Sequence, residues 1–96
     1  TIDGWLGELI LLPTSSLAKL PDAVTYEDAA TLSGSGVTVW HALHEVAQVR
    51  SDDIVLTLGT GGVSSFGVLL AKAAGARVVV TSSSDEKLAQ MRALGA

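Results

Sequence analysis

The second half of the chain carries two hydrophobic patterns, one typical of buried strands and one typical of helices. Short, nearly continuous apolar runs occupy residues 54–58 and 77–81, as expected for strands that are covered on both faces. Residues 63–74 between them repeat apolar side chains at helical spacing, and one helix face would carry Val63, Phe66, Gly67, Leu70 and Ala74. These patterns predict two buried strands joined by a helix.

Residues typical of helix ends predict where the helices of this half begin and end. Gly75 follows the first helix directly, as a left-handed terminator does. Beyond the second strand, Ser83 and Glu86 have the spacing of a capping box, which predicts a final helix over 86–94. The order strand, helix, strand, helix indicates a βαβα unit, whose strands we expect to be parallel and joined by a right-handed crossover.

The start of the chain is harder to interpret. Aliphatic residues run up to Pro13, and we expect a strand within residues 1–16. Residues 19–22 contain a proline and read as an extended connector.

Helices are expected in the segment that follows. Residues 25–28 match a capping box that opens a short helix ending near Leu32. The glycines within residues 33–36 predict a bend, after which apolar spacing predicts a second helix over 37–49 and a polar turn at 50–53. The expected fold class is therefore α/β: the first βαβα unit of a doubly wound parallel sheet, preceded by a strand and two helices.

The amino-acid composition excludes some classes of function for this chain. The chain has 96 residues, of which 48% are hydrophobic and 17% charged, with a net charge of −4; this fits one small folded domain or a piece of a larger one. No basic footprint for nucleic acid is present. We expect no membrane partner, because no apolar run reaches about 18 residues, and a cytoplasmic location, because neither cysteine nor a signal sequence is found.

A glycine-rich loop is the clearest candidate for a ligand-binding motif. Gly59-Thr60-Gly61-Gly62 follows the first predicted strand and opens a predicted helix, which is the context of a dinucleotide-binding turn. Gly59 allows a sharp turn, and Gly61 lets a pyrophosphate approach the backbone, where unpaired amides of the helix start favour an anion. Ser64 stands where the third glycine of this fingerprint is expected, so we predict strained packing there. An ordinary tight turn is the alternative interpretation.

The end of the second strand bears on the type of cofactor. An acidic residue usually holds a ribose 2′-hydroxyl at this place, but the strand ends in Thr81 and Ser82. A hydroxyl cluster of Ser82 and Ser83 together with Lys87 suits a 2′-phosphate. We therefore expect NADP(H) rather than NAD(H); the alternative is that the serines only cap the helix.

Other residues that look chemical are interpreted as structural. His41 and His44 share a predicted helix face, but a metal site needs a third ligand, and none is evident. Trp5 and Trp40 are expected to pack rather than stack on a ligand. The serines beside Gly34 lack the context of a hydrolase elbow, and no Gly-Lys-Ser/Thr follows the glycine loop, so a P-loop is excluded.

Runs along the whole chain resemble one superfamily, the medium-chain dehydrogenases/reductases, which includes zinc-dependent alcohol dehydrogenases and zinc-free quinone oxidoreductases. The most similar runs are residues 55–64, 71–78, 83–88 and 94–96, with shorter ones at 3–8, 27–31 and 36–40. The resemblance implies a fragment with a partial Rossmann fold. Residues 1–20 would end the barrel-like catalytic domain, and residues 21–96 would form the N-terminal half of the NAD(P)-binding domain.

The resemblance also implies roles for individual residues. The pyrophosphate loop falls on Gly59, Thr60, Gly61, Gly62 and Val63. A threonine near the nicotinamide falls on Thr38, and the adenosine-ribose position falls on Ser82. Gly34 replaces a cysteine ligand of the zinc-dependent members, which makes zinc doubtful and favours an NADPH-dependent quinone-oxidoreductase type.

Several functions stay open at this point. The first is a parent enzyme, expected to be a homodimer, that transfers hydride between the cofactor and a quinone, enone or carbonyl; no residue of this chain is assigned as catalytic. A zinc-dependent alcohol dehydrogenase is the alternative within the family. A binding module for adenosyl-methionine or FAD is a different class, since fold alone does not exclude it. The chain alone is expected to be inactive and to self-associate through unpaired strand edges.

Overall fold

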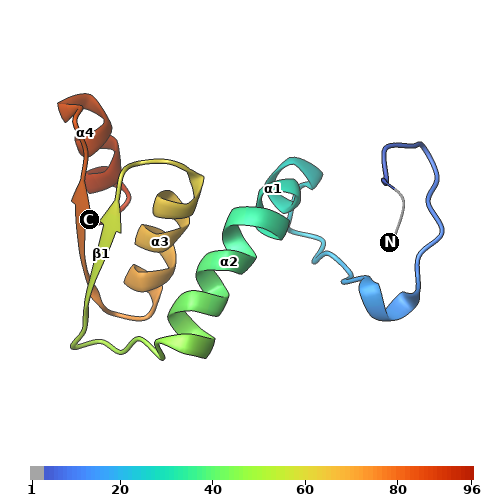
Figure 1. Ribbon diagram of the computed structural model, residues 1–96, viewed down its shortest axis with the longest axis horizontal. Coiled ribbons are helices and arrows are strands. Elements are labelled where there is room, and N and C mark those ends of the chain that lie inside the picture. Colours follow the sequence, from blue (N-terminus) through green and yellow to red (C-terminus); the bar gives the residue numbers. More distant parts are fainter. Residues whose placement is uncertain (1–3) are drawn as a thin grey trace.

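Two parallel strands form the sheet of the computed structural model, which describes residues 4–96. Strand β1 (Ile54–Leu58) pairs in parallel with β2 (Arg77–Thr81). Helix α3 (Gly62–Ala73) connects the strands, and α4 (Asp85–Ala93) follows β2, as Figure 1 shows. The predicted βαβα unit and its parallel pairing are confirmed.

The ends of α3 and α4 show which residues terminate and cap these helices. Gly75 adopts φ +83° and ends α3, as predicted, and Ala76 N donates to Ala71 O at 3.0 Å. The cap of α4 is Ser84 rather than Ser83, because Ser84 has extended backbone angles and its hydroxyl accepts from Lys87 N at 3.4 Å. With the cap one residue later, Lys87 replaces Glu86 as the third residue of the helix. A lysine has no acceptor atom for a reciprocal bond, so no capping box forms.

The core lies where α3 crosses the sheet. Val68 and Ala71 of α3 are fully buried, together with Gly67. Other elements add Val39, Ala76 and Met91. Val63 was expected on this buried face but is 52% exposed. It lies in the first turn of α3, near the end of the sheet rather than over its middle.

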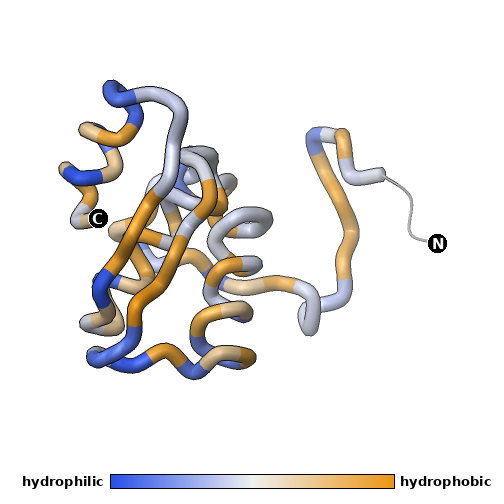
Figure 2. The backbone as a smooth tube through the Cα atoms, turned by 60° about the vertical axis from the view of Figure 1, so that its left-hand side comes forward, coloured by the Kyte–Doolittle hydropathy of each residue, from blue (hydrophilic) through white to orange (hydrophobic). Residues whose placement is uncertain are grey.

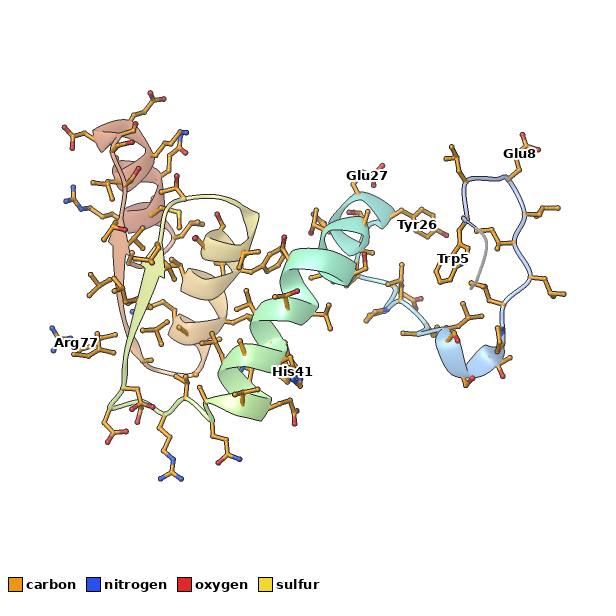
Figure 3. The ribbon with its side chains drawn as sticks, viewed as in Figure 1. Trp5, Glu8, Tyr26, Glu27, His41 and Arg77 are labelled. Atoms are coloured by element: carbon orange, nitrogen blue, oxygen red, sulfur yellow. The ribbon has the colours of Figure 1, made fainter. Side chains whose placement is uncertain are left out.

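Only one face of the sheet is covered in the described part of the chain. Helix α3 packs against both strands, and α4 packs against β2. The prediction of strands covered on both faces is therefore wrong for residues 4–96, since Ile54, Leu56 and Leu58 stay 57–75% exposed. Figure 3 shows Arg77 pointing away from α3 on this open side.

The segment before β1 forms one continuous helical stretch. It consists of α1 (Tyr26–Thr31), the π-helical η2 (Leu32–Gly36), α2 (Val37–Trp40) and the π-helical η3 (His41–Val46). Thr25 caps α1 as predicted, accepting from Asp28 N at 3.1 Å.

The predicted bend at residues 33–36 is wrong, because these residues stay helical. Gly36 serves close packing instead of a turn, since a Cβ placed there would lie 3.2 Å from Cδ2 of Leu32 and 3.7 Å from a ring atom of Phe66. The following polar turn is confirmed: Arg50 N donates to Oδ2 of Asp53 at 2.7 Å.

The N-terminal segment extends away from this assembly (Figures 1 and 2). Residues 4–13 form no strand, and the short 3-10 helix η1 (Thr14–Ser16) follows them. The expected strand is therefore absent from the described part of residues 1–16, because no other strand lies beside it to take its backbone hydrogen bonds. The radius of gyration of 16.0 Å exceeds the roughly 13 Å typical of a compact chain of this length.

Candidate functional site

The glycine loop begins where β1 ends, beside the end of β2. Gly59 takes φ +86°, a left-handed conformation that a glycine adopts without strain. Its amide donates to Thr81 O at 2.9 Å. This bond brings the loop and the end of β2 to the same edge of the sheet, and the positive φ of Gly59 agrees with the sharp turn expected there.

The start of α3 offers an open place for an anion. Gly61 is the N-cap, no side chain caps the helix, and no acidic residue lies in its first turn. No heavy atom comes within 4 Å of the position a Cβ would take at Gly61. The amides of Gly62, Val63 and Ser64 have no intrahelical acceptor, and the helix dipole adds positive potential there. A diphosphate group of a dinucleotide fits this cradle.

Thr60, between the two glycines, is partly buried, and Gly62 begins the helix. A Cβ at Gly62 would lie 3.1 Å from the hydroxyl oxygen of Ser35. The sequence does not indicate Ser35 as a neighbour of the loop, since a bend is expected at residues 33–36. No periodic signal connects positions so far apart in the sequence.

Thr38 also lies beside the loop. It lines a pocket of about 280 Å³ together with Leu58, Val63 and Ser64. Its hydroxyl donates to Gly34 O at 2.8 Å, so the lone pairs of that oxygen stay available as acceptors. Of the loop residues that the sequence assigned to one site with Thr38, the structure places Val63 in the same pocket.

The hydroxyls and the lysine after β2 form the second part of the candidate site. Ser82 is partly buried, and its Oγ accepts from Ser84 N at 3.2 Å, which leaves its own hydrogen free to donate. Ser83 and Lys87 are exposed. Asp85 and Glu86 are exposed beside Lys87 in the first turn of α4.

The two histidines and two tryptophans stand apart from this site. Figure 3 shows His41 pointing away from β1, and the ring of His44 lies 4.0 Å from that of Trp40. Within residues 4–96, no group of three or more metal-ligating side chains gathers. Trp5 and Trp40 are 52% and 51% exposed, so each is only half-buried, and Trp40 packs against His44. No helix among the described residues is long and apolar enough to cross a membrane.

Known proteins resemble the chain along its whole length. A zinc-type alcohol dehydrogenase-like protein of Schizosaccharomyces pombe is 46% identical over 98 aligned positions, which cover 100% of this chain and 28% of that protein. An alcohol dehydrogenase of Geobacillus stearothermophilus is 34% identical, again over 100% of this chain and 28% of its own length. No model of a known protein family matches the chain.

A solved structure supports the same relationship. The quinone oxidoreductase of Pseudomonas syringae pv. Tomato DC3000 superposes with a TM-score of 0.79 and 44% identity, covering 88% of this chain and 26% of that one. The chain therefore spans less than a third of the length of these relatives. Their sequences and this fold show that the chain belongs to the medium-chain dehydrogenase/reductase superfamily.

Proposed function

We propose that this chain binds the nicotinamide cofactor of an oxidoreductase that transfers hydride to or from a quinone, enone or carbonyl compound. The open, uncapped start of α3 behind Gly59 and Gly61 is the observation that carries the proposal. Relatives named as a quinone oxidoreductase and as alcohol dehydrogenases support the reaction class.

Different residues of the site bind different parts of the cofactor. The amides that follow Gly61 hold the diphosphate, because they are unpaired and lie at the positive end of the helix. Ser82 and its neighbours face the adenosine ribose, since Gly59 N bonds Thr81 O and sets the two strand ends side by side. Thr38, beside Val63, offers acceptor lone pairs toward the nicotinamide end.

The bound nicotinamide supplies the hydride chemistry, and this chain supplies binding and orientation. No described side chain is assigned as a proton donor. Gly34 stands where the zinc-dependent members of the family have a cysteine, so we propose a reaction without zinc. Measuring the zinc content of the purified protein tests this point, and a stoichiometric zinc ion would overturn it.

NADP(H) is the proposed cofactor rather than NAD(H). The end of β2 carries no carboxylate, and the Ser82 hydroxyl retains a hydrogen to donate. Lys87 lies one turn into α4 and is exposed, so its ammonium group is available to a 2′-phosphate. A carboxylate at the same place would repel that phosphate and accept from a free ribose hydroxyl instead.

Titration of the intact protein with NADPH and NADH tests the proposal. We expect tighter binding of NADPH, and Ser82→Asp should weaken NADPH binding at least about tenfold while NADH binding stays equal or improves. Ser15→Ala, at an exposed position of η1, is the control and should leave both affinities unchanged. An unchanged preference for NADPH in Ser82→Asp would refute the role of Ser82. Binding of adenosyl-methionine or FAD without NADPH would overturn the oxidoreductase assignment.

A further inference from the structure

Ser64 occupies the position where a dinucleotide-binding turn usually has its third glycine, and the structure gives its side chain a partner. Its hydroxyl donates to Leu58 O, the last carbonyl of β1, at 3.1 Å. The bond spans six residues, so it closes a ring around the whole glycine loop. The strained packing expected at Ser64 stays a prediction; the structure adds that the side chain makes this hydrogen bond.

The direction of the β1 backbone explains why this carbonyl needs a partner. Asp53 O accepts from Arg77 N, and Gly59 N donates to Thr81 O, so residues 53 and 59 face β2. Backbone groups of successive residues in a strand point to alternate sides. Leu58 O therefore points away from β2, toward the edge of β1 that no described strand covers, and Ser64 satisfies it.

Ser65, the next residue, makes hydrogen bonds at the other end of the loop. Ser65 N donates to Gly61 O at 2.9 Å, and its hydroxyl lies 3.1 Å from the same oxygen. The Ser65 hydroxyl also lies 3.8 Å from Sδ of Met91 on α4. Two successive residues at the start of α3 thus hold the carbonyls that begin and end the turn.

We propose that Ser64 is a positioning residue, which holds the glycine loop in the shape that receives the cofactor diphosphate. This role rests on the proposed function, because it concerns the same loop. A loop fixed before binding loses less conformational freedom when the ligand arrives, which raises affinity. The serine hydroxyl would then replace, by a hydrogen bond, the close helix–strand packing that a glycine gives in the usual fingerprint.

The test compares three substitutions at one position in the intact protein. Ser64→Ala and Ser64→Gly remove the hydroxyl and should each raise the Kd for NADPH about fivefold, the effect of one ordinary hydrogen bond. Ser64→Thr keeps the hydroxyl and should bind as the wild type does. The control is Ser15→Ala, which removes a hydroxyl from the exposed helix η1; it should leave the Kd unchanged.

A second ligand separates positioning from general destabilisation. Adenosine 2′-monophosphate lacks the diphosphate, so its Kd should be the same in Ser64→Ala and in the wild type. An equal loss for both ligands would overturn the proposal. Tighter NADPH binding by Ser64→Gly would also overturn it, since small size rather than the hydroxyl would then be what the position requires.

Amide hydrogen exchange keeps this proposal distinct from the proposed function. Without ligand, the amides of Gly59 and Ser65, which donate to Thr81 O and Gly61 O, should exchange about fivefold faster in Ser64→Ala than in the wild type. If the wild type binds no nicotinamide cofactor, the proposed function falls, and faster exchange still supports Ser64 as the residue that fixes the loop. Unchanged exchange would overturn the role of Ser64 whatever the protein binds.

Discussion

The βαβα unit and the N-terminal segment both contain apolar runs, but only the runs of the βαβα unit form strands and a buried core. Residues 54–96 contain buried Val68, Ala71 and Met91, and the two strands pair along their full length. In residues 4–13, Leu6, Leu9 and Leu11 are almost fully exposed, and no regular strand forms. Figure 2 shows both regions with long apolar stretches, one folded together and one extended.

The difference shows that an apolar run becomes ordered structure only when a partner lies within reach. Helix α3 returns the chain to the sheet, so β1 and β2 meet after a short connection. The leucines before Pro13 have no such return. Apolar burial stabilises by about 25 cal/mol per Å², and Leu6, Leu9 and Leu11 gain almost none of it from the described residues.

The largest effect is expected where α3 crosses β1. A Cβ at Gly67 would lie 3.0 Å from Cγ2 of Thr57, so Gly67→Val should lower the free energy of unfolding by about 3 kcal/mol. Gly34→Ala is the control, because nothing lies within 4 Å of a Cβ at that helical glycine; it should cause no loss. Urea unfolding of the two variants checks this, and equal losses would contradict the packing described.

A pair of truncations compares the two regions directly. Val68 is fully buried and Leu9 is 96% exposed. In this chain, Val68→Ala should lower the free energy of unfolding by about 2 kcal/mol, whereas Leu9→Ala should change it by less than about 0.5 kcal/mol. A loss at Leu9 as large as the loss at Val68 would show that the N-terminal segment packs on the rest.

The smallest expected changes in the free energy of unfolding come from replacing threonine by valine at two positions. The Thr57 hydroxyl is buried with no hydrogen-bond partner among the described residues, so Thr57→Val should raise the free energy of unfolding by up to about 1 kcal/mol. Thr25→Val removes the cap of α1 and should lower it by about 1 kcal/mol. Shifts of the same sign in thermal unfolding would contradict the hydrogen bonding described.

Most of the βαβα unit could be predicted because its signals are local. Strand 77–81, the turn at Gly59 and the terminator Gly75 each follow from a few adjacent residues. The N-terminal strand could not be judged in this way, because its existence depends on a partner that adjacent residues do not reveal. The open face of the sheet escaped prediction for the same reason.

The candidate site was predictable to a similar extent. The glycine loop and Thr38 follow from motif and resemblance, and Thr38 shares a pocket with Val63 and Ser64 at the start of α3. Ser35 and the bond from Ser64 to Leu58 required coordinates, since hydroxyl partners depend on side-chain direction. The choice between NADP(H) and NAD(H) and self-association through the open strand edges stay predictions.

The central claim is that the backbone after Gly59 holds a dinucleotide diphosphate, and one substitution tests it most directly. Gly61 has extended backbone angles, φ −79° and ψ −178°, and open space around it, so Gly61→Val is compatible with the fold. Its side chain would fill the space that the diphosphate needs. Ala73→Val adds a branched side chain at an exposed position of the same helix and is the control.

The measurement is the Kd for NADPH of these two variants beside the wild type, by calorimetric titration of the intact protein. The account predicts a loss of at least about tenfold for Gly61→Val, unchanged binding for Ala73→Val, and little change in the unfolding temperature of Gly61→Val. Binding of NADPH by Gly61→Val as tight as by the wild type would contradict the account.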